Sequence, residues 1–63
     1  MKTSLEIREE LSELILGGYL NTAKQIIADL PDYARMLGVP EILTPLQVAE
    51  FREAITTAEL SSH

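Results

Sequence analysis

The sequence predicts an all-α fold: a small helical bundle with an antiparallel pair of helices, a short third helix and a capped C-terminal helix. Three observations carry this prediction. Apolar residues recur at intervals of three and four, no stretch alternates apolar and polar residues as a strand would, and two capping patterns precede apolar runs. The chain has 63 residues, so we expect a single domain over residues 1–63.

The first helix is predicted over residues 4–16. Thr3 and Glu6 have the spacing of a capping box, in which the hydroxyl and the carboxylate each accept a hydrogen bond from a backbone N–H at the helix start. Gly17 and Gly18 should end the helix, because Gly readily adopts the left-handed conformation found at many helix ends. The apolar face of this helix consists of Ile7, Leu11, Leu14 and Ile15.

A second helix is predicted over residues 20–29. Its apolar residues recur at helical spacing: Leu20, Ala23, Ile26, Ile27 and Leu30. Since only a short link separates it from the first helix, the two should fold back as an antiparallel hairpin. Pro31 should then break the helix, because the residue before a proline disfavours the helical conformation.

A short third helix is predicted over residues 33–37, with Asp32 as its cap and Gly38 as its end. The last helix is predicted over residues 45–60 and has the clearest local signal. Here Thr44 is a good cap, Pro45 suits the first helical position, and Gln47 completes a second capping box, while Leu43 before the cap can pack on Val48. The inner face of this helix consists of Val48, Phe51, Ile55 and Ala58.

Few residues in the chain carry chemistry. There is no Cys, and the single His is His63, so the ligands that zinc, copper and haem sites mainly use are missing. Nucleophilic catalysis needs Ser, Thr or Cys beside a base, which is most often His. We therefore expect no metal, no cofactor and no enzyme activity.

The charge balance bears on partners and location. Ten Asp and Glu against five Lys and Arg give a net charge of −5, which disfavours nucleic acid and anionic membranes as partners. An acidic surface suits solubility or a basic protein partner. The longest uncharged apolar stretch, residues 14–20, is too short to span a bilayer. With no Cys and no signal-peptide segment, the sequence predicts a cytoplasmic protein.

Small size favours self-association. A domain of this length buries only about 60% of its unfolded surface, and natural mini-domains add disulfides, a metal or a partner chain. The sequence therefore predicts a homo-oligomer, most simply a dimer, and the alternative is a monomer with a small but sufficient core.

Two groups of residues are candidate partner-binding sites. The first is an acidic stripe on the first helix, which is either a docking face for Lys and Arg or a solvated face. Its members are Glu6, Glu9, Glu10 and Glu13. The second group is apolar and surrounds the breaks near Gly38, where it either binds a partner or closes the open end of the hairpin as core. Its members are Tyr33, Met36, Leu37, Ile42 and Leu43, with Leu46 as a related side chain that should point sideways.

Residues 33–40 read Tyr-Ala-Arg-Met-Leu-Gly-Val-Pro and look similar to the middle of a helix-turn-helix motif. Residues 43–48 and 51–54 resemble a stretch near the start of some small repressor domains. This resemblance implies a DNA-binding transcriptional regulator. A recognition helix, however, needs Arg, Lys, Asn or Gln toward the base edges, and residues 45–60 offer only Gln47 and Arg52 among three Glu residues.

The sequence as a whole favours a small acidic protein–protein interaction module: a regulator, inhibitor or adaptor that acts by binding rather than catalysis. The first alternative is the helix-turn-helix regulator. A further alternative is a structural helical subunit of an oligomeric assembly.

Overall fold

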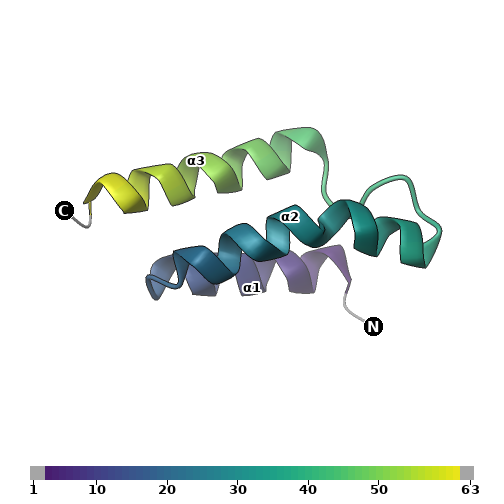
Figure 1. Ribbon diagram of the computed structural model, residues 1–63, viewed down its shortest axis with the longest axis horizontal. Helices are drawn as coiled ribbons and strands as arrows, with labels where there is room; N and C mark the ends of the chain where they lie inside the picture. Colours follow the sequence, from purple (N-terminus) through teal and green to yellow (C-terminus); the bar gives the residue numbers. More distant parts are fainter. Residues whose placement is uncertain (1–2, 62–63) are drawn as a thin grey trace.

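The computed structural model describes residues 3–61, in which there are three α-helices and no strand. Helix α1 spans Ser4–Leu16, α2 spans Leu20–Leu37 and α3 spans Pro45–Ser61. The predicted all-α class is confirmed. Figure 1 shows α1 and α2 side by side with opposite chain directions, and α3 above them running in the direction of α1. Each helix packs against both of the others.

Both predicted capping boxes are present. At the start of α1, the Glu6 backbone N–H donates to Thr3 Oγ1 at 3.2 Å, and the Thr3 N–H donates to Glu6 Oε1 at 3.4 Å. At the start of α3, the Gln47 N–H donates to Thr44 Oγ1 at 3.2 Å, and the Thr44 N–H donates to Gln47 Oε1 at 3.0 Å. These reciprocal bonds satisfy backbone donors that a helix start otherwise leaves unpaired.

The two predicted glycine stops are also present. Gly18 follows α1 with φ of 82°, and Gly38 follows α2 with φ of 72°, so both occupy the left-handed region that favours glycine. The next residue in each case donates its N–H back into the helix: Tyr19 to the Leu14 carbonyl at 2.8 Å and Val39 to the Ala34 carbonyl at 3.0 Å. Each turn therefore satisfies carbonyls at the helix end and reverses the chain.

The prediction of separate helices over residues 20–29 and 33–37 is wrong, because α2 continues through Pro31. A proline inside a helix costs about 3 kcal/mol, since it removes one hydrogen bond and crowds the preceding turn. The continuation keeps Leu30 and Ala34 buried on the same face as the first half of α2. Burying one large apolar side chain stabilises by about 1.5–3 kcal/mol, which offsets the cost. Asp32 is consequently not a helix cap and instead forms an ion pair with Arg35 on the same helix.

The core lies where the three helices meet. Leu11 is fully buried at 0% exposure, and Ile55 on α3 is 2% exposed. The buried apolar cluster consists of Ile7, Leu11, Ala23, Ile27, Leu30, Leu43 and Ile55. Helix α3 thus contributes one buried residue. Its other predicted inner residues Val48, Phe51 and Ala58 are half-buried, the first two against the cluster.

The molecule is long and exposes much of its surface. Its dimensions are 40 × 19 × 16 Å, and its solvent-accessible area is 4575 Å². A folded monomer of 7.0 kDa is expected to expose about 4,000 Å². In Figure 1 the last turns of α2 and the connection over residues 38–44 project beyond the other two helices. The exposed area is thus somewhat larger than that expected for a compact monomer of this mass.

Candidate functional site

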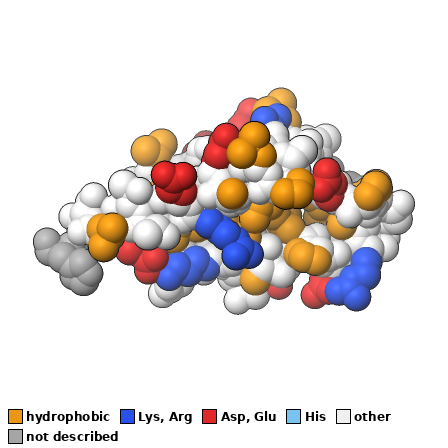
Figure 2. Space-filling view, turned by 90° about the horizontal axis from the view of Figure 1, so that it is seen from above, with side chains coloured by type: hydrophobic (Ala, Val, Ile, Leu, Met, Phe, Trp, Pro, Cys, Tyr) orange, Lys and Arg blue, Asp and Glu red, His pale blue; other side chains and the backbone are white. Residues whose placement is uncertain are grey.

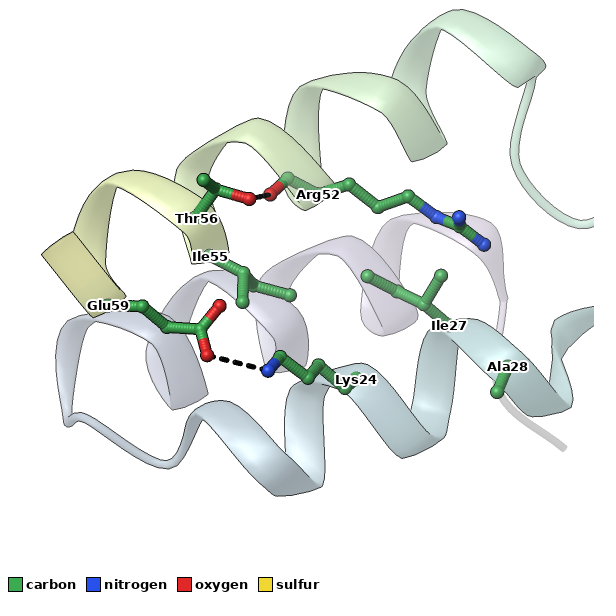
Figure 3. A pocket seen from close by; sticks show the side chains of 7 residues that line it. All are labelled: Lys24, Ile27, Ala28, Arg52, Ile55, Thr56 and Glu59. Atoms are coloured by element: carbon green, nitrogen blue, oxygen red, sulfur yellow. Dashed lines mark hydrogen bonds and ion pairs between the residues drawn. The ribbon is translucent and has the colours of Figure 1, made fainter.

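A groove runs between α2 and α3, and Figure 3 shows its first hollow. This hollow has a volume of about 340 Å³. Its lining consists of Lys24, Ile27, Ala28, Arg52, Ile55, Thr56 and Glu59. Lys24 Nζ of α2 lies 2.6 Å from Glu59 Oε2 of α3, and this ion pair spans the groove at one end. Both side chains are about half exposed, so the pair contributes roughly 0–1 kcal/mol.

Arg52 is the charged residue at the centre of the groove. In Figure 3 its side chain extends along the groove above Ile27. Between residues 3 and 61, no hydrogen bond or ion pair involves its guanidinium group. Arg52 also lines the second hollow of the groove, so it stands between the two. A guanidinium group left unpaired beside apolar side chains is a ready donor for a carboxylate.

The second hollow lies beneath the connection that follows α2 and has a volume of about 190 Å³. At roughly 30 Å³ per water molecule, this is room for about six waters or one large apolar side chain. Its walls are mostly apolar and include Pro31, Pro40, Ile42 and Val48. A hollow of this kind, open at one side, suits an anchoring side chain from another protein better than a free small molecule.

The apolar group predicted to bind a partner is divided in the structure. Leu43 belongs to the core at 4% exposure, so for this residue the structure supports the alternative that it closes the hairpin as core rather than the one that it anchors a partner. In Figure 1 the connection turns back from the end of α2 toward α3, and Leu43 is buried near the end of this connection. Tyr33, Leu37 and Ile42 are half-buried. Met36, which is 82% exposed, remains accessible.

Met36 and Leu46 lie on outer faces. Met36 follows the buried Ala34 by two positions, which is about 200° around the helix. Leu46, at 69% exposure, precedes the buried Ile55 by nine positions and therefore lies about 180° from it on α3. We call Met36, Leu37, Val39 and Ile42 the connection patch. Leu46 belongs to a different surface, the outer face of α3.

The acidic stripe lies on α1. Glu6, Glu9 and Glu13 are exposed, and Glu10 is half-buried. Glu6 also serves in the capping box, so one of the four carboxylates has a structural role. On the other side of α3, a hollow of about 560 Å³ separates α3 from the end of α1. Two of its lining residues, Glu50 and Glu53, are acidic, so this side of α3 differs in charge from the side that carries Arg52.

The structure does not have the helix-turn-helix geometry that residues 33–40 resemble. The predicted first helix is the last part of α2, and seven residues, 38–44, separate it from α3 instead of a turn of three or four. Arg35 is paired with Asp32, and the outer face of α3 carries Glu50 and Glu53. This distribution gives a DNA backbone little to bind.

Within residues 3–61, no three His, Cys, Asp or Glu side chains gather closely enough to hold a metal ion. His63 lies outside the described residues. In the same part of the chain, no helix is long and apolar enough to cross a membrane. The ion pair between Lys24 and Glu59 joins residues 35 positions apart, and no local pattern in the sequence signals it.

Comparison of the chain with protein-family models, with curated proteins and with solved structures gave no match.

Proposed function

We propose that this protein is a small cytoplasmic interaction module that binds another protein through the connection patch and acts by binding rather than by catalysis. The observation that carries the proposal is the apolar exposure of the connection patch, where Met36 is 82% and Val39 is 40% exposed, while Ile42 of the same patch lines an apolar hollow with room for one side chain. Methionine adapts to the shape of a partner, and the hollow that Ile42 lines can receive an anchor from that partner in return.

The acidic stripe gives this proposal a kinetic component. Exposed carboxylates on α1 attract a basic protein over distances of about 10 Å at moderate ionic strength. A partner with a basic surface would therefore associate faster at low salt, while its dissociation rate would depend on the connection patch.

The test is affinity capture from a nuclease-treated native lysate, followed by mass spectrometry. Met36→Gln keeps a flexible unbranched side chain of good helix propensity and removes its apolar character. We expect the wild-type chain to retain one stoichiometric protein that the M36Q variant loses. The matched control is Leu5→Gln, which changes an exposed apolar residue on α1 and should leave capture unchanged. Equal capture by the wild type and M36Q would reject the connection patch as the binding surface.

We also propose, as a second function, that the chain forms a homodimer. The specific support is the exposed area, which exceeds that expected for a monomer of this mass, and the sparse burial of α3. A dimer would cover apolar side chains that a single chain leaves in water.

A further inference from the structure

The second hollow of the groove has one charge of each sign at its edge. Its walls are formed by apolar residues of α2, of the connection and of α3. Among residues 3–61, two charged residues line it, Arg52 of α3 and Glu41 of the connection, and both are exposed. Figure 2 shows the same combination at the surface, where apolar side chains lie among separate positive and negative ones. The hollow therefore offers an apolar interior together with one cation and one anion.

These two charges do not neutralise each other. In the part of the chain that the structure describes, no hydrogen bond or ion pair involves the Glu41 carboxylate or the Arg52 guanidinium group. The Arg52 side chain instead lies along the groove above Ile27 (Figure 3). An occupant that covers the hollow removes solvent from both charges, so each of them then needs a complementary group on that occupant.

The first hollow differs from the second in its charges. Its Lys24 and Glu59 side chains already form an ion pair with each other, at 2.6 Å. The other charged residue that lines it, Arg52, is shared with the second hollow. Recognition of charge along the groove is therefore concentrated at the second hollow.

We propose that the second hollow receives a large apolar side chain from a segment of the partner protein, and that this segment has an acidic residue on one side of the apolar residue and a basic residue on the other. This inference rests on the proposed function and names the chemistry of the segment that the partner inserts. The hollow, at about 190 Å³, has room for one such side chain. Ile42 belongs both to the hollow and to the connection patch, so the two form one continuous surface.

The two charges also determine the direction of the segment. Arg52 stands between the two hollows, so the acidic residue of the segment lies toward the first hollow, where a guanidinium group can bind its carboxylate through two hydrogen bonds. Glu41 belongs to the connection, so the basic residue lies on that side. A segment with the two charges exchanged would bring like charges together at both positions and would be rejected.

A protein segment suits the hollow better than a free apolar amino acid, which also carries one charge of each sign. The segment covers the hollow and the connection patch together, and the patch contributes Met36 and Val39 as further apolar contacts. A free amino acid would leave that patch in water. The hollow then acts as the pocket for one anchor within a larger interface.

The first test is selection of binders to the purified full chain from a phage-displayed library of random peptides. We expect the selected peptides to share one large apolar residue with Asp or Glu on one side and Lys or Arg on the other. Replacing that apolar residue by Ala in a synthetic peptide should weaken binding by about tenfold or more. Failure to select any peptide, or selected peptides without the two charges, would overturn the proposal.

A charge exchange tests the recognition itself. Fluorescence anisotropy gives the dissociation constants of a selected peptide and of a version in which its acidic and basic residues are exchanged. The wild type should prefer the original peptide by about tenfold, and the double variant E41R/R52E should prefer the exchanged one. The matched control R35E/E50R exchanges two exposed charges that do not line the hollow and should keep the wild-type preference. If E41R/R52E keeps that preference as well, the proposal is wrong. Circular dichroism verifies that each variant retains its helix content.

Other occupants of the hollow give different results. Calorimetric titration with free leucine that matches the affinity of the peptides would make the hollow a small-molecule site and overturn the proposal. Sedimentation velocity over a concentration series measures self-association, and a dimer that E41R/R52E abolishes would assign the hollow to a second copy and overturn the proposal too.

The lysate capture distinguishes this inference from the proposed function. A partner that M36Q loses and E41R/R52E retains would leave the connection patch in place and overturn the role of the hollow alone. A partner that E41R/R52E loses and M36Q retains would support the hollow and reject the connection patch.

Discussion

The pair formed by α1 and α2 and the third helix, α3, are held in different ways. The first two helices face each other with six buried residues at helical spacing: Ile7, Leu11, Ala23, Ile27, Leu30 and Ala34. Helix α3 has 17 residues and a complete capping box, yet it buries only Ile55. Its apolar side chains are spread around the helix, and hollows lie on both sides of it.

This difference separates helix formation from helix packing. Caps and proline position determine where a helix begins, and α3 has the better start signals of the three. A continuous apolar stripe determines how firmly a helix is packed, and there α1 and α2 are superior. A helix that is locally well specified and loosely packed leaves apolar side chains exposed, as α3 does with Leu46 and Leu60.

The largest expected effect comes from the α1–α2 side of the comparison. Leu11→Ala removes most of a fully buried side chain and should destabilise the fold by about 4 kcal/mol through lost burial and a residual cavity. At 63 residues the whole domain has about 3–9 kcal/mol of stability, so the variant should be largely unfolded at moderate temperature. Urea denaturation followed by circular dichroism measures the change. A loss below about 1 kcal/mol would contradict the central position of Leu11.

Ile55→Ala should cost less, about 3 kcal/mol, because Ile55 already borders a hollow into which the surroundings can relax. The loss should fall mainly on α3. Hydrogen exchange should show faster exchange for the amides of α3 than for those of α1 and α2. Uniform loss of protection in all three helices would show instead that the molecule opens as one unit.

Pro31→Ala should stabilise the protein. Inside a helix, alanine is about 3 kcal/mol more favourable than proline. The loss of proline also makes the unfolded chain more flexible, which lowers the stability by up to about 1 kcal/mol. The net gain in folding stability should therefore be about 2 kcal/mol. The measurement is the midpoint of thermal unfolding, which should rise by several degrees. The matched control is Pro45→Ala, because Pro45 stands at the first position of α3 where proline is well tolerated, and its midpoint should change little or fall.

The smallest effect concerns the helix starts. Thr44→Ala removes the hydroxyl that accepts the Gln47 N–H and should cost about 1 kcal/mol. Thr44→Asp keeps an acceptor at the cap and should retain most of the stability, so comparing the two variants by urea denaturation separates capping from a general effect of substitution. Equal losses for both would contradict the capping role.

Local signals predicted the starts of α1 and α3 and the glycine ends of α1 and α2, because each depends on a few neighbouring residues. Pro31 misled the prediction because its cost is local while the compensating burial of Leu30 and Ala34 comes from other helices. The position of Leu43 also depends on the path of a connection, which the sequence does not specify. The groove between α2 and α3 could not be predicted at all, since Lys24, Arg52 and Glu59 meet only after folding.

The arrangement of three helices with alternating direction has an electrical consequence. Backbone dipoles of neighbouring antiparallel helices cancel in pairs, so an odd number leaves the equivalent of about half an elementary charge of opposite sign at each end of the long axis. The last turns of α1 and α3 carry no basic residue that would neutralise the negative end. A single chain should therefore orient along its 40 Å axis in an applied electric field. A homodimer whose two-fold axis is perpendicular to the long axis of each chain would cancel that polarity, and the field response would fade as concentration rises.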